Sequence, residues 1–215
     1  MGTLARAIVV LGLALGAVRI VASGRTLAGL VGRPLSESQR HTTNEDQLAK
    51  CDASFAARVR AVIQDLESHG FKPWVAESWR SPADQAQAFT LGRSEVKAGF
   101  HNVVGLHGEP RAFAVDLIDN PLAADPSQEY ALRLSSVAHQ YNLTTGILWG
   151  LSNQERRVVG KAVESPRVRG KVKIGWDPCH LEPADQSLSQ VLEYVARLRR
   201  QKSVFPNFVE NMTHP

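Results

Sequence analysis

The sequence contains only two cysteines among its 215 residues. Two are too few for a disulfide-stapled scaffold or for a zinc cage built from cysteines. In an oxidising compartment Cys51 and Cys179 could pair with each other, but the sequence does not show whether their Cα atoms approach closely enough. If they do not pair, we expect Cys179 to be a small buried apolar residue.

Internal repeats and low-complexity segments are also missing, and no basic stripe is interleaved with aromatic residues. The last absence argues against nucleic acid as a partner. With 43% hydrophobic residues the chain can form one compact core of ordinary size, so we expect one domain with terminal extensions. The net charge is only +4, and the basic residues look scattered. This fits either attraction to an anionic polymer such as a cell wall or an ordinary solvated surface.

The N-terminus carries an apolar run over residues 7–18, preceded by Arg6 and followed by Arg19. About a dozen residues are too few for a typical membrane span but are typical of the apolar part of a signal peptide. We therefore expect residues 1–23 to be a signal peptide and the protein to be exported to the periplasm or cell envelope. The alternative is an uncleaved membrane anchor through residues 5–23, because Arg19 interrupts the run.

The remaining chain divides by pattern into a polar linker over residues 24–50, a domain over 51–200 and a C-terminal tail over 201–215. Helical apolar spacing and start signals predict helices over 52–69, 82–91, 127–140 and 187–199. Shorter apolar stretches predict strands over 71–79, 146–151 and 172–176, and the polar segment 152–169 is predicted to be an exposed loop or hairpin bordering a cleft. We expect Trp79, Trp149 and Trp176 to pack in the core. The expected fold class is α+β, with helices packed on a small antiparallel sheet.

Residues 99–119 hold the first candidate functional group. His101 and His107 lie in a loop with glycine and proline, and this loop runs into an apolar strand that contains Asp116. An ionised carboxylate in an apolar strand costs several kcal/mol to bury unless a charge, a hydrogen-bond network or a metal compensates it. A bound metal ion is the simplest compensation.

A second group lies far downstream, where Asp177, His180 and Glu182 lie within six consecutive residues. Imidazole and carboxylate ligands suit Zn²⁺, and three protein ligands with one open position describe a catalytic site. On a regular strand His180 and Glu182 would share a face, whereas Asp177 needs a turn, which Pro178 indicates, to converge with His180. Asp177 or Glu182 could accept a proton from bound water, and Glu182 could instead orient His180.

Three sequence blocks then resemble one family. They are ESWRSPADQAQAFTLGR, FHN followed by AVDLID, and WDPCHLE. In this order they resemble the zinc D-Ala-D-Ala carboxypeptidases, dipeptidases and L-alanyl-D-glutamate endopeptidases that cut peptidoglycan stem peptides. That family shares its fold with the hedgehog signalling domain and the lysostaphin-type peptidases, and the resemblance covers about residues 51–200.

The resemblance implies that His101, Asp116 and His180 hold zinc. It also implies that Asp177 is the general base and that Arg80 stabilises the oxyanion. Two departures are visible: Gly99 stands where the family often has serine, and the spacing from His101 to Asp116 is longer than in many members. His107 lies nearer to Asp116 and is the competing ligand.

The expected activity is therefore an exported, monomeric zinc peptidase acting on peptidoglycan stem peptides. D-Ala-D-Ala carboxypeptidase activity is preferred to L-alanyl-D-glutamate endopeptidase activity. A non-catalytic cell-wall-binding module on the same fold is the alternative from another class.

Overall fold

The computed structural model describes residues 34–92, 94, 96–119, 126–165 and 170–204. The predicted signal segment (1–23) and residues 205–215 of the predicted tail lie outside the described residues. The described elements follow in the order α1 (Glu37–Leu48), α2 (Ala53–Ser68), β1 (Trp74–Glu77), α3 (Pro82–Thr90), the 3₁₀ helix η1 (Phe100–Asn102), β2 (Val115–Ile118), α4 (Gln128–Gln140), β3 (Leu143–Gly146), α5 (Asn153–Glu164), β4 (Asp177–Pro183) and α6 (Leu188–Val204).

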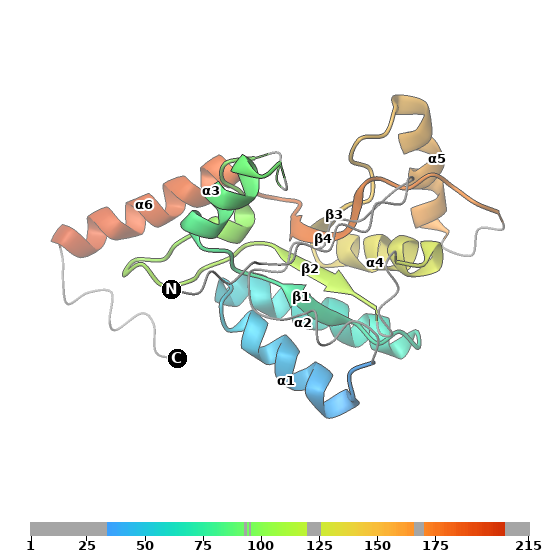
Figure 1. The fold of residues 1–215 in the computed structure, drawn as a ribbon, viewed down its shortest axis with the longest axis horizontal. Coiled ribbons are helices and arrows are strands. Elements are labelled where there is room, and N and C mark those ends of the chain that lie inside the picture. The colour runs from blue at the N-terminus through green and yellow to red at the C-terminus, as the bar shows by residue number, and fades with distance from the viewer. Residues whose placement is uncertain (1–33, 93, 95, 120–125, 166–169, 205–215) are drawn as a thin grey trace, which may run out of the picture.

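The four strands form one antiparallel sheet in the order β1-β2-β4-β3. In Figure 1, α1 and α2 lie below this sheet, and α3 and α5 lie above it at its two sides. The structure confirms the expected α+β class and the small antiparallel sheet with helices packed on it.

The sheet has one face in the core and one that bears polar side chains. Along β2, Val115 and Leu117 are fully buried. Asp116, which lies between them, and Ile118, which follows Leu117, are partly exposed. This alternation follows from the period of two along a strand. The main hydrophobic core lies on the buried face and includes apolar residues of α2, α4 and α6. Asp116 consequently points away from that core.

The predicted helices over 52–69, 82–91, 127–140 and 187–199 are confirmed to within a few residues, the last continuing to Val204. Three of them begin where the sequence places a capping side chain. Asp52, Ser81 and Ser127 each accept a hydrogen bond from a backbone N–H in the first turn of the following helix. Such caps satisfy N–H groups that have no partner within the helix.

The predicted linker over 24–50 is wrong for its second half, because residues 37–48 form α1. Ser36 and Gln39 make a capping box at its start. The helix attaches to the domain mainly through polar side chains: Asn44 donates to the carbonyl of Pro73 and accepts from the backbone N–H of Val75. An apolar stripe, which is the usual sign of a helix in sequence, is therefore not what holds α1 in place.

The predicted loop over 152–169 is also wrong, because residues 153–164 form α5. Ser152 and Glu155 make a capping box, and Val159, Ala162 and Val163 are buried on one face. The strands predicted over 146–151 and 172–176 lie differently: β3 ends at Gly146, and β4 begins only at Asp177.

Candidate metal centre

Two strands and one 3₁₀ turn position the candidate site. Asp116 of β2 lies directly across the sheet from His180 of β4. His101 belongs to η1, where its carbonyl accepts a hydrogen bond from the Arg80 backbone N–H at 2.9 Å. One ligand atom of each of His101, Asp116 and His180 lies within 4.8 Å of the others. Among the described residues this is the one such group of three histidine, cysteine or acidic residues.

The contacts in this group are short. His101 Nε2 lies 3.3 Å from His180 Nδ1 and 3.5 Å from Asp116 Oδ1, and His180 Nδ1 lies 3.2 Å from the same Oδ1. The outer nitrogen of each ring has a different partner. His101 Nδ1 contacts the Ser78 carbonyl oxygen, and His180 Nε2 lies 3.1 Å from Glu182 Oε2.

These outer partners fix the tautomer of each of the two imidazoles. A carbonyl or carboxylate oxygen can only accept, so His101 carries a proton on Nδ1 and His180 carries one on Nε2. In the neutral rings, His101 Nε2 and His180 Nδ1 then offer lone pairs to the same point as the Asp116 carboxylate. Three acceptors facing one another at this range require a cation between them, either a proton or a metal ion.

The protonation tendencies agree with this description. Burial opposes the charged form of His180, but hydrogen bonds with Asp116 and Glu182 outweigh it and raise its pKa to about 10. Desolvation likewise opposes the ionised form of Asp116, yet its two histidine partners hold its pKa well below the ordinary value. The site therefore favours a positive charge next to the Asp116 carboxylate, which either a proton or a metal ion can supply.

Arg80 is held beside this group by two side chains of the same segment. Glu77 accepts from Arg80 Nε at 2.8 Å and from Nη2 at 2.6 Å, and Gln85 accepts from Nη1 at 2.8 Å. A guanidinium has five N–H donors, so two remain for another acceptor. The charge of Arg80 acts on the carboxylates of Asp116 and Asp177. Glu77 had no assigned role in the sequence analysis, although it lies only three residues before Arg80.

Asp177 opens β4 next to the metal-ligand group. Burial, with the Asp116 charge as the second cause, raises the pKa of Asp177 to about 6. Its backbone pairs with Gly146 of β3 at an irregularity in the register, where a Cβ on Gly146 would lie 2.3 Å from the Asp177 carbonyl oxygen. A carboxyl group that titrates near neutral pH is suited to accept and return a proton.

His107 lies apart from this group. It is exposed in the turn after η1, and its backbone N–H donates to Glu109 Oε2 at 2.7 Å. The structure therefore brings His101, and not the competing His107, to Asp116 and His180.

Trp149 packs beside His180, and Trp176 packs against Trp149, an arrangement that the sequence did not predict. The Trp149 ring centroid lies 5.0 Å from that of His180 and 5.2 Å from that of Trp176. Trp176 is 52% exposed, so its expected place in the core is wrong. The backbone before Trp176 lies close to the backbone of residues 146–149. Glycine at position 175 permits this, because a Cβ there would lie 2.6–2.7 Å from three backbone atoms of residues 146, 147 and 149.

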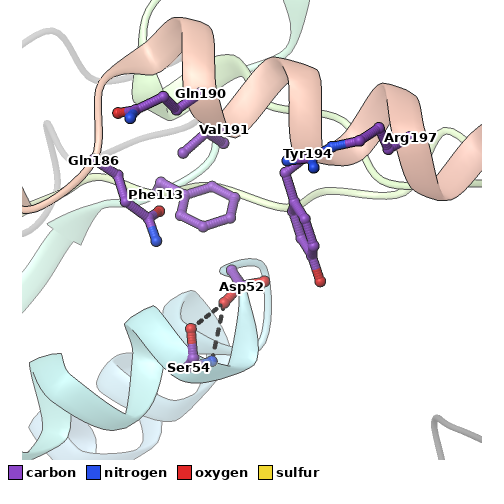
Figure 2. A pocket seen from close by; sticks show the side chains of 8 residues that line it. All are labelled: Asp52, Ser54, Phe113, Gln186, Gln190, Val191, Tyr194 and Arg197. Carbon is purple, nitrogen blue, oxygen red and sulfur yellow. Dashed lines mark hydrogen bonds between the residues drawn. The ribbon is translucent and has the colours of Figure 1, made fainter.

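A separate pocket lies between the start of α2 and α6 (Figure 2) and contains none of the ligand residues. Its acidic member, Asp52, is fully engaged: one oxygen caps α2 through Ser54 and Phe55, and the other accepts two N–H groups of Arg111. Cys51 and Cys179 are both free thiols, so the possible disulfide is not formed.

No family model matches the chain, and a comparison with curated proteins gives no match. Among the described residues, no helix combines the length and the apolar character needed to cross a membrane. The function is therefore inferred from the geometry of the site and from the motif resemblance.

Proposed function

We propose that the chain is a zinc-dependent peptidase that hydrolyses peptidoglycan stem peptides. D-Ala-D-Ala carboxypeptidase activity is the preferred form, and L-alanyl-D-glutamate endopeptidase activity is the alternative. The proposal includes the peptidase-like fold that the three sequence blocks imply, export to the cell envelope, and action as a monomer.

One observation carries the proposal: two imidazole lone pairs and a carboxylate oxygen converge, and each imidazole is oriented by an outer acceptor. His101, Asp116 and His180 would be the three protein ligands. Nitrogen and carboxylate donors of this kind suit Zn²⁺, and three of them leave a coordination position open. The outer contacts to the Ser78 carbonyl and Glu182 are of the kind that orients metal-bound histidines.

The residues around the ligands supply the remaining chemistry. When bound, zinc would act as a Lewis acid and lower the pKa of bound water to about 7. Asp177 would accept the proton of that water and return it to the leaving amine. Arg80 would direct its two remaining N–H groups at the oxyanion, and loss of such a donor typically costs about 10²–10³ in rate. Glu182 would keep the Nε2 proton on His180.

Incubation of the zinc-loaded protein with muropeptides, with and without a chelator, tests the activity. Mass spectrometry of the products identifies the bond that is cut. Release of D-Ala indicates the carboxypeptidase, and loss of the stem peptide beyond L-Ala indicates the endopeptidase. Zinc binding with neither product would leave a non-catalytic cell-wall-binding module and reject the enzyme.

Two variants separate metal binding from turnover. Asp116→Ala removes a ligand, so zinc binding should be lost. Asp177→Asn should keep zinc but reduce kcat by roughly 10²–10⁴, the usual contribution of a general base. Asp46→Asn is the matched control, since Asp46 is exposed on α1. Retained turnover in Asp177→Asn would transfer the proton-accepting role to Glu182.

A further inference from the structure

The positive charge of this protein is concentrated in one segment. Residues 152–176 contain seven lysines and arginines and only two acidic residues, a net charge of +5, whereas the whole chain has +4. The basic residues are therefore not scattered. We call α5 and the return segment to β4 (152–165 and 170–176) the basic lobe; it holds five of these seven basic residues and both acidic ones, a net charge of +3. In Figure 1 it projects from the body at the side opposite α6.

The charges of the basic lobe are largely unneutralised. In the rest of the domain five arginines each have an acidic partner within 4.0 Å: Arg40, Arg58, Arg60, Arg80 and Arg111. In the lobe, Lys173 is paired with Glu155 at 2.9 Å. Arg157, Lys161 and Lys171 are exposed and have no ion pair among the residues that the structure describes.

The cations stand on a backbone that is fixed in place. Arg157 and Lys161 are four residues apart, so they lie on the same face of α5. The return segment is tied to α4 on both sides of Lys171, because the Gln128 side chain donates to the Gly170 carbonyl at 2.9 Å and accepts from the Val172 N–H at 2.8 Å. Little ordering is therefore needed when these charges meet a ligand.

We propose that the basic lobe binds a linear anionic polymer whose negative charges repeat along its length. A membrane surface fits the lobe less well, because interfacial helices insert an apolar face into the lipid. The apolar residues Val159, Ala162 and Val163 of α5 instead pack against α4 in a second small core. Val158 is the one large apolar side chain that α5 exposes.

One end of the basic lobe lies close to the candidate metal centre. The lobe connects β3 to β4 and ends at Trp176, whose ring packs against Trp149, and Trp149 in turn packs against His180. A polymer bound along the lobe as far as Trp176 would reach the neighbourhood of the candidate metal centre and raise there the local concentration of anything attached to it. The proposal goes beyond the peptidase activity and does not depend on it, because it is tested by binding alone.

The test is calorimetric titration of the full chain with long-chain inorganic polyphosphate at several KCl concentrations. The variant Arg157→Gln/Lys161→Gln/Lys171→Gln removes three exposed cations of the lobe. Each neutralised contact contributes about 0.7–0.9 to the slope of log affinity against log salt, by analogy with nucleic acids. The slope should therefore fall by roughly 2–3, with a loss of affinity of roughly tenfold or more at low salt.

The matched control is Lys50→Gln/Lys72→Gln/Lys97→Gln, which also lowers the formal net charge from +4 to +1 but leaves the lobe intact. The proposal expects the control to bind like the parent chain. Equal losses in both variants would show an effect of net charge alone, and no loss in the lobe variant would show that the lobe is not the binding surface. Both results overturn the proposal, as would binding of the parent chain to phosphatidylglycerol vesicles but not to polyphosphate. Urea unfolding of each variant checks that folding is unchanged.

Discussion

Replacement of Glu182 tests whether the outer contacts of the two histidines prepare the site for a metal. His180 Nε2 lies 3.1 Å from Glu182 Oε2, and the His180 side chain is only 9% exposed. In Glu182→Ala the ring would lose this acceptor and could rotate or change tautomer, so Nδ1 would no longer be held toward Asp116. Loss of such an outer contact typically weakens metal binding by about 10–100-fold.

The expected effect can be worked out as a shift in melting temperature. At a zinc concentration of about 100 times the parent dissociation constant, binding stabilises the folded chain by about 2.7 kcal/mol. A dissociation constant about 10–100-fold higher reduces this to roughly 0.4–1.4 kcal/mol. For a domain of this size the zinc-dependent melting temperature should then fall by roughly 3–9 °C relative to the parent protein.

Two further variants sharpen this test. Glu182→Gln keeps an amide oxygen that can accept from Nε2, so its zinc affinity should lie between those of the parent and Glu182→Ala. Glu193→Ala removes an exposed acid on α6 and should leave zinc affinity unchanged. Competition with a chromogenic chelator measures each affinity. If Glu182→Ala binds zinc within twofold of the parent protein, the proposed tautomer control by Glu182 is refuted.

Two more predictions concern the stability of the fold. Asp52→Asn keeps a helix cap but loses the charge that Arg111 faces, so it should destabilise the fold by about 2–4 kcal/mol at pH 7 in urea unfolding. Burial raises the pKa of Asp52, but hydrogen bonds from Ser54 and Arg111 outweigh it and hold the pKa below its ordinary value. The stabilisation is therefore fully present above the unfolded pKa of about 4 and is lost as the pH falls through the folded pKa; a difference between parent and variant that does not shrink in acid would contradict this. Gly175→Ala should cost roughly 1–3 kcal/mol because its Cβ would clash with backbone, whereas Gly160→Ala, which has open space on α5, should be neutral or stabilising by about 0.5–1 kcal/mol; equal unfolding midpoints would show that the loop yields without strain.

Local patterns in the sequence were sufficient for the helices that combine an apolar stripe with a cap. The helices predicted over 52–69 and 127–140 are α2 and α4, which begin one residue later because Asp52 and Ser127 are their caps. α5 carries the same kind of signal in Ser152 and Glu155, but the polar and basic composition of residues 152–169 favoured a loop. The local signal for this helix is therefore present in the sequence, and its polar composition obscures it.

α1 is different, because its sequence is too polar to predict a packed helix. Arg40 and Asn44 are buried only because the Glu67 carboxylate and the backbone around Pro73 and Val75 provide partners. Those partners lie 27 or more residues away, and no local pattern specifies them. Tertiary context therefore decided this element.

The sequence by itself determined which side chains could hold a cation, because histidines and an aspartate within an apolar strand supply the nitrogen and oxygen donors that a buried cation needs. Only the tertiary structure decided how they are used. The antiparallel register of β2 and β4 places Asp116 opposite His180, and the turn at η1 selects His101 over His107 through contacts with the segment around Arg80. The ion pair of Glu77 with Arg80 and the packing of Trp149 beside His180 depend on contacts of the same kind. Such hydrogen bonds and ring contacts act over a few ångströms in space and not along the chain.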